Sequence, residues 1–300
     1  MRPEPPPPGA HRDRPIEVPL EAGRHVRRRR PQAVTPPSDD RLPALTYSSY
    51  LALDDLLAAQ RPLSDEHDEM LFIVIHQVYE LWFKELLHEF DRVRLLLEAD
   101  DSFRVQHTLK RVLTILKVAV AQIDVMETMT PRQFLGFRGR LEAASGFQSA
   151  QFRELEAMLG RRDRHALGRY PAGSEAQQRI AAAMSRPSLF DSFLRYLATQ
   201  GFDVPVEAVK RDVEQPRSPS EDVQQLLLAV YRDDGEPAQV AERLVDLDEG
   251  VQEWRYRHVK MVERTIGTRP GTGGSTGATY LRKTLFEPVF PDLWAVRSEL

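Results

Sequence analysis

The chain has 300 residues, no cysteine and a formal net charge of −4 at pH 7, from 41 lysines and arginines against 45 aspartates and glutamates. This slight acidic excess argues against a dedicated nucleic-acid binder. Without cysteine, a metal site must be built from histidine, carboxylate, tyrosine or methionine side chains, so the eight histidines are the first candidates for metal ligands. No apolar run is long enough to span a membrane, and the N-terminus lacks the apolar segment of a secretory signal. We therefore expect no membrane partner and a cytoplasmic location.

Residues 1–40 differ in composition from the rest of the chain. They hold ten of the 22 prolines and the four-arginine run Arg27 to Arg30. Such a segment has too little apolar surface to order itself, so we expect a solvated tail. A basic arm that touches a partner is the alternative. The composition of residues 41–300 is even, which predicts a single domain.

The remainder of the chain consists of long stretches of helix formers separated by short breaks, which predicts an all-α fold. Ser64, followed by acidic residues, is the expected N-cap of the first long helix. The expected helices cover residues 47–60, 65–99, 102–127, 147–160, 175–184, 187–200, 219–232, 236–266 and 276–286.

The segment 71–90, LFIVIHQVYELWFKELLHEF, is apolar at nearly every position of its first turns. A helix of this kind is expected to be buried on all sides. At helical spacing Phe72, His76, Tyr79 and Phe83 share one face, so the His76 imidazole lies among aromatic rings. It either bonds to a neighbouring polar group in the core or faces a cavity.

A second histidine has a similar setting in the segment 251–266, VQEWRYRHVKMVERTI. His258 falls on the apolar face defined by Val251, Trp254 and Met261, so it is expected to point inward. Four basic residues surround it on the other faces of the helix: Arg255, Arg257, Lys260 and Arg264. They suit an anionic ligand such as haem propionates, or they form a solvated basic face.

Two further segments carry groups that suit a carboxylate. The glycine-rich loop from Gly271 to Gly277 follows a helix and lacks the closing Lys-Ser or Lys-Thr of a phosphate loop, but its backbone could form a small anion nest. Ser275 or Thr276 could cap the next helix. Arg138 stands among aromatic residues ahead of a Ser-Gly turn, and arginine binds carboxylates with two parallel hydrogen bonds. A flexible surface loop and a surface arginine are the plainer alternatives.

Taken together, these segments resemble the tryptophan 2,3-dioxygenase family from about residue 45 to residue 294. The motifs that carry the resemblance are LTYSSYLALDDLL at 45–57, PLSDEHDEMLFIVIHQVYELWFKELLHE at 62–89, METMTPRQFLGFRGRL at 126–141, SGFQSAQFRELE at 145–156, WRYRHVKMVERTIG at 254–267 and GTGGSTGATYLRK at 271–283.

The resemblance implies an all-α homotetramer in which each subunit holds one haem b through one axial histidine. His258 matches that iron ligand, and His76 matches the distal histidine that accepts a hydrogen bond from the substrate indole N–H. Phe72 matches the aromatic residue packed on the indole. Arg138 matches the clamp on the substrate carboxylate, and Thr272 matches the residue that receives its carboxylate and ammonium end.

Other positions of the family pattern are also present. Phe134 stands where family members carry Tyr or Phe, and Ser145 and Gly146 match positions close to the haem edge. Three residues match an N-terminal helix that reaches into the neighbouring subunit's active site in the family: Tyr47, Tyr50 and Leu51. The tetramer is then needed for a complete pocket.

The implied reaction inserts both atoms of O₂ across the indole C2–C3 bond of L-tryptophan and gives N-formylkynurenine. One alternative is a haem monooxygenase of the same superfamily acting on a substituted tryptophan or tyrosine, because Glu142, Ala143 and Pro270 depart from the family pattern near the substrate end. A second alternative is a haem sensor without turnover, in which the Pro/Arg tail is the interaction arm.

Overall fold

The structure, a computed structural model, describes residues 44–142, 144–272 and 277–300. Within those ranges every regular element is helical, which confirms the all-α prediction. The α-helices are α1 (Tyr47–Leu51), α2 (Leu53–Leu57), α3 (His67–Glu98), α4 (Ser102–Met126), α5 (Pro131–Arg138), α6 (Ala150–Met158), α7 (Glu175–Met184), α8 (Leu189–Thr199), α9 (Val206–Lys210), α10 (Glu221–Asp233), α11 (Glu236–Ile266), α12 (Ala278–Arg282) and α13 (Pro291–Ala295). Three short 3₁₀ helices are η1 (Gly146–Gln148), η2 (Arg164–Arg169) and η3 (Val296–Ser298).

The chain divides into two units, residues 1–52 and 53–300, which are described separately. In the first unit, Thr46 and Ser49 form a reciprocal capping box at the start of α1. Ala52 ends this helix in a left-handed conformation with φ 49°. The helix expected over 47–60 is therefore two short helices. The expected tail, residues 1–40, lies outside the described residues.

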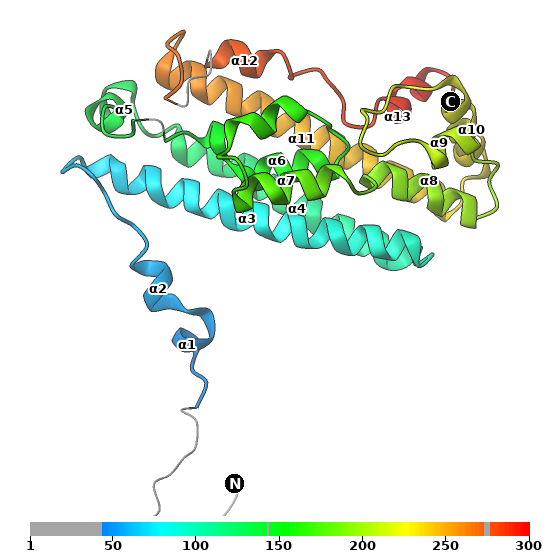
Figure 1. The fold of residues 1–300 in the computed structure, drawn as a ribbon, viewed down its shortest axis with the longest axis horizontal. Helices are drawn as coiled ribbons and strands as arrows, with labels where there is room; N and C mark the ends of the chain where they lie inside the picture. The colour runs from blue at the N-terminus through cyan, green and yellow to red at the C-terminus, as the bar shows by residue number, and fades with distance from the viewer. Residues whose placement is uncertain (1–43, 143, 273–276) are drawn as a thin grey trace, which may run out of the picture. The chain divides into compact units, whose positions relative to one another are not determined.

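Three long helices, α3, α4 and α11, form the core of the second unit (Figure 1). Helix α4 packs against both α3 and α11 through a fully buried stripe that includes Val105, Leu109 and Val112. Burial of such side chains stabilises a fold by about 1.5–3 kcal/mol each. The packing holds the α3 and α11 histidines on two helices that share α4 as a common support.

The start of α3 differs from the prediction. Its first helical residue is His67, and Ser64 does not cap it. Instead the Glu69 carboxylate accepts hydrogen bonds from the Leu63 N–H at 2.8 Å, the Ser64 N–H at 2.8 Å and the Ser64 hydroxyl at 2.5 Å. The acidic side chain thus satisfies the backbone donors of Leu63 and Ser64, while the Ser64 hydroxyl oxygen accepts from Glu66 N at 3.3 Å, ahead of the first helical residue.

Helix α3 is also not buried on all sides in the single chain. Met70, Val74 and Leu81 are 43%, 38% and 48% exposed. They recur at i, i+4 and i+11, so they form an apolar strip along one face of α3. The expectation of complete burial was wrong for this face, because no described residue packs against it closely enough to bury it.

Several of the shorter helices differ from those predicted from the sequence. Residues 175–184 and 236–266 are helical as expected, but α5, α9 and α13 were not predicted because each is short and has a proline at or next to its start. Ser149 divides the helix expected over 147–160 into η1 and α6 by accepting a hydrogen bond from Phe152 N at 3.1 Å. The last expected helix, 276–286, is reduced to α12.

A buried carboxylate ties the C-terminal segment back onto α11. Asp248 accepts hydrogen bonds from Val289 N at 2.9 Å, Phe290 N at 2.8 Å and Trp294 Nε1 at 2.9 Å. The segment after α12 is thereby held against the helix that carries His258.

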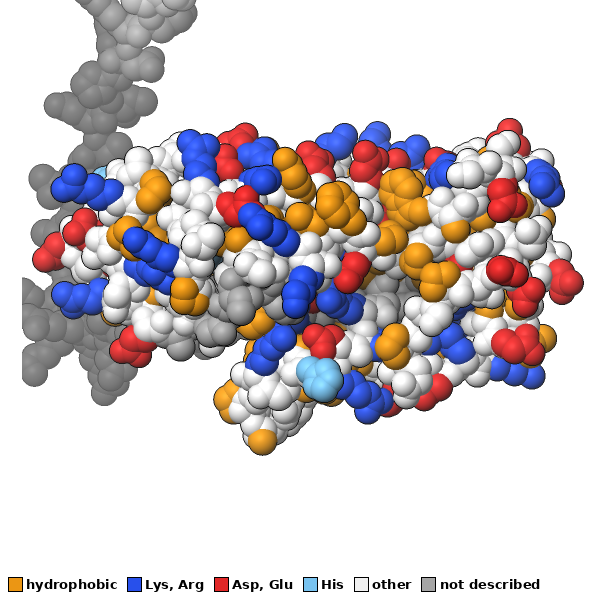
Figure 2. Space-filling view, turned by 90° about the horizontal axis from the view of Figure 1, so that it is seen from above, with side chains coloured by type: hydrophobic (Ala, Val, Ile, Leu, Met, Phe, Trp, Pro, Cys, Tyr) orange, Lys and Arg blue, Asp and Glu red, His pale blue; other side chains and the backbone are white. Residues whose placement is uncertain are grey.

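No described helix has the length and apolarity required to cross a membrane. On the face seen in Figure 2, acidic and basic side chains are interspersed with scattered apolar ones.

Candidate active site

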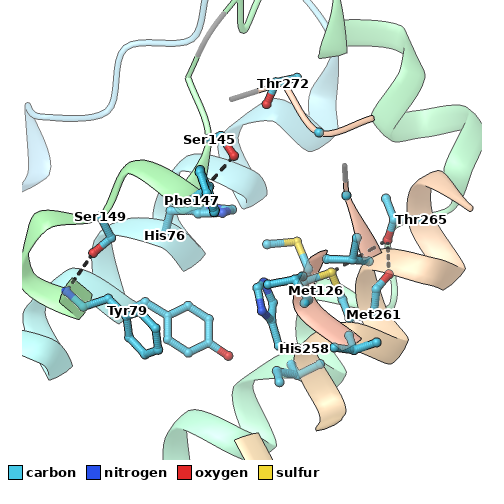
Figure 3. A pocket seen from close by; sticks show the side chains of 18 of the residues that line it. His76, Tyr79, Met126, Ser145, Phe147, Ser149, His258, Met261, Thr265 and Thr272 are labelled. Carbon is cyan, nitrogen blue, oxygen red and sulfur yellow. Dashed lines mark hydrogen bonds between the residues drawn. The ribbon is translucent and has the colours of Figure 1, made fainter. Parts of the chain in front are cut away.

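A cavity in the second unit lies between α3 and α11 and has a volume of about 230 Å³. Helices α5 and α6, the Ser-Gly turn before η1 and the segment around Thr272 supply its other walls. Figure 3 shows His76 and Tyr79 on one side of this cavity and His258, Met126 and Met261 on the other. The lining is largely apolar, so polar groups within it interact in a medium of low dielectric constant.

The geometry of His76 determines which of its ring nitrogens can accept a hydrogen bond. Its Nδ1 lies 2.7 Å from the Phe72 carbonyl oxygen, which can only accept, so Nδ1 carries the proton. Burial lowers the pKa of His76, although the Phe72 carbonyl and the Glu80 carboxylate partly oppose this. The ring is therefore neutral near pH 7, with Nε2 as an acceptor.

Gly146 leaves space beside that acceptor. A Cβ atom at this position would come within 3.9 Å of His76 Cδ2 and Nε2. Ser145 holds the turn by accepting a hydrogen bond from Phe147 N at 3.3 Å. The Ser-Gly turn thus passes close over the His76 ring without covering it with a side chain.

His258 lies on the opposite wall, on α11. Burial, with a smaller contribution from His76, lowers the pKa of His258 to about 4, so its imidazole is neutral at physiological pH. Its ring stacks on Trp254 with centroids 5.1 Å apart and an angle of 18° between the planes. It makes no hydrogen bond to any described residue, and the lone pair of an imidazole nitrogen is free to bind a metal.

Aromatic rings form the wall on the α5 side of His76. The Phe72 ring lies 4.1 Å from the His76 ring, 5.7 Å from Phe134 and 5.5 Å from Phe137, between centroids. Phe134 and Phe137 meet edge to face at 5.4 Å. Such contacts fix the rings in place and make this part of the cavity suited to a flat apolar group.

Arg138 and Thr272 stand together at one rim of the cavity. Arg138 donates one hydrogen bond to the Pro270 carbonyl at 2.5 Å, and its other N–H groups bond to no described residue. The Thr272 hydroxyl donates to the Ala144 carbonyl at 2.8 Å, which leaves its oxygen free to accept. This rim offers donors for a carboxylate and an acceptor for an ammonium group.

The glycine loop needs its last glycine for steric reasons. Gly277 has φ 63°, and a Cβ there would come within 2.6 Å of the Arg269 carbonyl oxygen. Gly273 to Thr276, on which the predicted nest and helix cap depend, lie outside the described residues. So does Ala143, whereas Glu142 has the left-handed φ of 46°.

Comparisons with known proteins find relatives that match most of the chain. The family model described as tryptophan 2,3-dioxygenase matches residues 34–178 and 220–300. A tryptophan 2,3-dioxygenase from Anaeromyxobacter dehalogenans (strain 2CP-C) is 69% identical over 257 residues, 86% of this chain and 97% of the relative. Tryptophan 2,3-dioxygenases from Herpetosiphon aurantiacus and Caulobacter vibrioides are 56% and 47% identical, over 86% and 85% of this chain and 99% and 98% of their own.

The chain belongs to the tryptophan 2,3-dioxygenase family.

Most of the residues expected from the family resemblance meet in the one cavity. Those that line it are Phe72, His76, Phe134, Arg138, Ser145, Gly146, His258 and Thr272. The remaining three are on α1 in the other unit, with side chains 76%, 72% and 41% exposed: Tyr47, Tyr50 and Leu51. Their role in a neighbouring subunit stays a prediction.

The basic residues near His258 divide into two groups. Only Arg255 lines the cavity, and it is buried. Arg257 pairs with Asp124 at 2.5 Å, and Lys260 pairs with Glu263 at 3.1 Å, while Arg264 also bonds to a glutamate outside the cavity lining. For these three the solvated basic face is correct, because helical periodicity turns them away from His258.

Several lining residues were missed from the sequence. Arg153 and Glu156 on α6 face the cavity, as do Met126, Met129 and Phe152. Arg153 and Glu156 lie three residues apart within the matched motif SGFQSAQFRELE, and this helical spacing was the sequence signal that could have indicated an ion pair. Nothing in the local sequence shows that this pair lies opposite α11.

The donor set in this cavity fits a haem better than a bare metal ion. Within the described residues no group of three His, Asp or Glu side chains is placed to hold a metal. A porphyrin supplies four nitrogen ligands, so its iron needs only one imidazole from the protein. His258 is neutral, has no hydrogen-bond partner among the described residues and opens onto a mainly apolar cavity.

Proposed function

We propose that this chain is a haem-dependent dioxygenase that cleaves the indole C2–C3 bond of L-tryptophan with O₂ to give N-formylkynurenine. The observation that carries the proposal is the pairing, within one apolar cavity, of a neutral His258 with His76, whose Nε2 is an acceptor. Relatives that cover nearly the same length carry the name of this activity.

In this proposal His258 holds the iron of one haem b per subunit. When bound, the haem supplies the activation of O₂ that the side chains of the cavity cannot provide. Trp254, stacked on His258, limits rotation of the imidazole ring. Phe72, Met126 and Phe152 contribute apolar surface to the cavity and exclude water from it.

The substrate is oriented by groups at two positions. His76 Nε2 accepts the indole N–H, and it positions the ring rather than removing a proton, because an indole N–H is too weak an acid for a neutral imidazole to deprotonate readily. Arg138 binds the carboxylate through its uncommitted N–H groups, and Thr272 accepts from the ammonium group. Fixing both ends of the amino acid places the C2–C3 bond in one orientation.

We further propose a homotetramer, in which a second copy of the chain covers apolar surface left exposed here. Two features support it: the strip of Met70, Val74 and Leu81 on α3, and the exposed Tyr47 and Tyr50 on α1. Apolar side chains exposed in rows are typical of interfaces between subunits. Analytical ultracentrifugation of the purified chain measures the assembly directly.

Product analysis tests the reaction. The haem-loaded chain is reduced anaerobically and given L-tryptophan with ¹⁸O₂, and the product is analysed by mass spectrometry. We expect two labelled oxygen atoms in a ring-opened product. Incorporation of one oxygen atom would instead identify a monooxygenase, and a haem-loaded chain that neither responds spectrally to L-tryptophan nor consumes O₂ would identify a sensor.

A further inference from the structure

The turn at residues 145–149 passes over the His76 ring, so its position determines how much room a substrate finds there. A Cβ atom on Gly146 would lie 3.9 Å from His76 Nε2, and Figure 3 shows Ser145 and Phe147 beside His76. Two backbone hydrogen bonds, of 2.9 and 3.1 Å, close the turn on itself. They do not fix the turn relative to α3, which takes contacts with residues outside the turn.

Tyr170 supplies one of these contacts from the segment between α6 and α7. Its hydroxyl lies 3.3 Å from the carbonyl oxygens of both Gln148 and Ser149, and its single proton is shared between the two acceptors. Burial raises the pKa of Tyr170, so the hydroxyl keeps its proton at physiological pH. The phenol therefore holds the end of the turn as a donor.

Arg169, the preceding residue, contacts the same turn through an aromatic ring. Its guanidinium carbon lies 4.5 Å from the centroid of the Phe147 ring. A cation within about 6 Å of a ring centroid is attracted by the electron-rich face of the ring. Phe147 lines the cavity, whereas Arg169 and Tyr170 do not, so both residues act on the cavity wall from behind it.

A second arginine contacts the Phe147 ring from α6. Arg153 lies 5.4 Å from the ring centroid and pairs with Glu156 Oε2 at 2.5 Å. Glu156 Oε1 in turn lies 3.5 Å from both Arg161 Nη1 and Arg255 Nη2. These ion pairs make Arg153 a fixed part of the cavity wall, against which Arg169 can hold the ring.

The segment that carries Arg169 and Tyr170 is itself anchored on α7. Gln177 Nε2 donates to the Leu167 carbonyl in η2 at 3.1 Å. The Leu167 and Tyr170 side chains pack against a small buried cluster that includes Ile180 of α7. Contacts made by this segment therefore locate the turn relative to a helix rather than to another loop.

We propose that Arg169 and Tyr170 form a clasp that fixes the turn 145–149 over His76 and so positions the substrate indole at Nε2. This inference rests on the proposed role of His76. Release of the clasp lets the turn move, so that its backbone obstructs Nε2 or admits water to it. Either movement weakens the hydrogen bond from the indole N–H. Both are positioning residues, because neither lines the cavity.

Amide hydrogen exchange tests whether the clasp holds the turn. Tyr170→Phe removes the hydroxyl, and Arg169→Gln removes the cation. In the full, haem-loaded chain, each variant should exchange the amides of residues 145–149 about three- to tenfold faster than wild type, as measured by mass spectrometry. Arg169→Lys, which keeps a cation, should exchange at close to the wild-type rate.

Ligand discrimination tests whether the clasp positions the substrate. Binding of L-tryptophan is compared with binding of 3-benzothienylalanine, in which sulfur replaces the indole N–H, to the reduced protein without O₂. Tyr170→Phe and Arg169→Gln should each reduce the wild-type preference for L-tryptophan about three- to tenfold. The loss should fall on L-tryptophan, while the affinity for the sulfur compound and the Soret band change little.

Tyr231 and Arg297 provide the matched control. Arg297 lies 5.1 Å from the centroid of the Tyr231 ring and donates to its hydroxyl at 3.1 Å, and neither residue lines the cavity. Tyr231→Phe and Arg297→Gln should keep the wild-type exchange rate at 145–149 and the wild-type preference. Circular dichroism checks that every variant folds, and Arg169, which is exposed, is the more tolerant of the two clasp positions.

The outcomes separate the clasp from the function on which it rests. Unchanged exchange at 145–149 in the folded variants would overturn the clasp. Faster exchange with the full preference for L-tryptophan would show that the turn is held but does not position the indole, which overturns the positioning role. If wild type bound the two ligands equally, the proposed role of His76 would fail, and this inference with it.

Discussion

Replacing His76 by alanine tests whether this histidine positions the indole through Nε2. The structure leaves Nε2 as the acceptor, because Nδ1 is committed to the Phe72 carbonyl at 2.7 Å. Removing the imidazole leaves the substrate N–H buried without a partner, which costs about 1–3 kcal/mol. That range corresponds to a loss of L-tryptophan affinity of about 5- to 150-fold.

The assay is anaerobic equilibrium binding to the reduced, haem-loaded protein, with two ligands. One is L-tryptophan and the other is 3-benzothienylalanine, a close isostere in which sulfur replaces the indole N–H. Wild type should prefer L-tryptophan, and His76→Ala should bind the two almost equally while it retains haem. The ligand pair separates the hydrogen bond from the loss of ring contacts, since the contact between the tilted Phe72 and His76 rings, 4.1 Å apart, is lost in the variant with either ligand.

Two results would refute this reasoning. Wild type could bind the sulfur isostere as tightly as L-tryptophan, in which case no protein group accepts a hydrogen bond from the indole N–H. Alternatively, His76→Ala could retain the full preference, in which case another acceptor does so.

Three further predictions follow from the same contacts. His258→Ala should lose the Soret band while its far-ultraviolet circular dichroism is unchanged, and a normal Soret band would contradict the axial assignment. Arg138→Gln should raise KM for L-tryptophan about tenfold or more but leave tryptamine binding unaffected, because tryptamine has no carboxylate; equal losses for both would contradict a clamp. Burial alone would raise the pKa of Asp191, but hydrogen bonds from Arg211 and Ser188 lower it. Asp191→Asn should therefore cost about 3 kcal/mol of stability at pH 7 in chemical denaturation. Wild-type stability should fall below about pH 4 as this carboxylate protonates, and an equally steep fall in the variant would contradict the assignment.

The sequence by itself determined the helical class and the inward faces of the two central helices. A run without proline, with Phe72, His76 and Tyr79 at helical spacing, specifies one face of α3 from local geometry alone. The same periodicity placed His258 on the inward face of α11, but it did not separate Arg255, which lines the cavity, from the other basic residues of that helix. The order of motifs supplied the family and, with it, Arg138 and Thr272.

Local reasoning failed where a competing side chain, or the covering of an apolar face, decided the outcome. Ser64 has the residue pattern of a helix cap, yet the Glu69 carboxylate takes its donors and α3 starts later. The exposed strip on α3 was predicted to be part of the core. Apolar composition indicates that a helix face is to be covered, but not what covers it.

Only the tertiary structure decided how the groups of the cavity meet. Glu156 and Arg255 are 99 residues apart and lie within 3.5 Å, and Arg138 reaches a carbonyl 132 residues away. Such contacts follow from how α3, α4 and α11 pack, which no local pattern encodes. The sequence therefore identified two histidines suited to the chemistry, whereas the fold placed them on opposite walls of one cavity and gathered three arginines on Glu156.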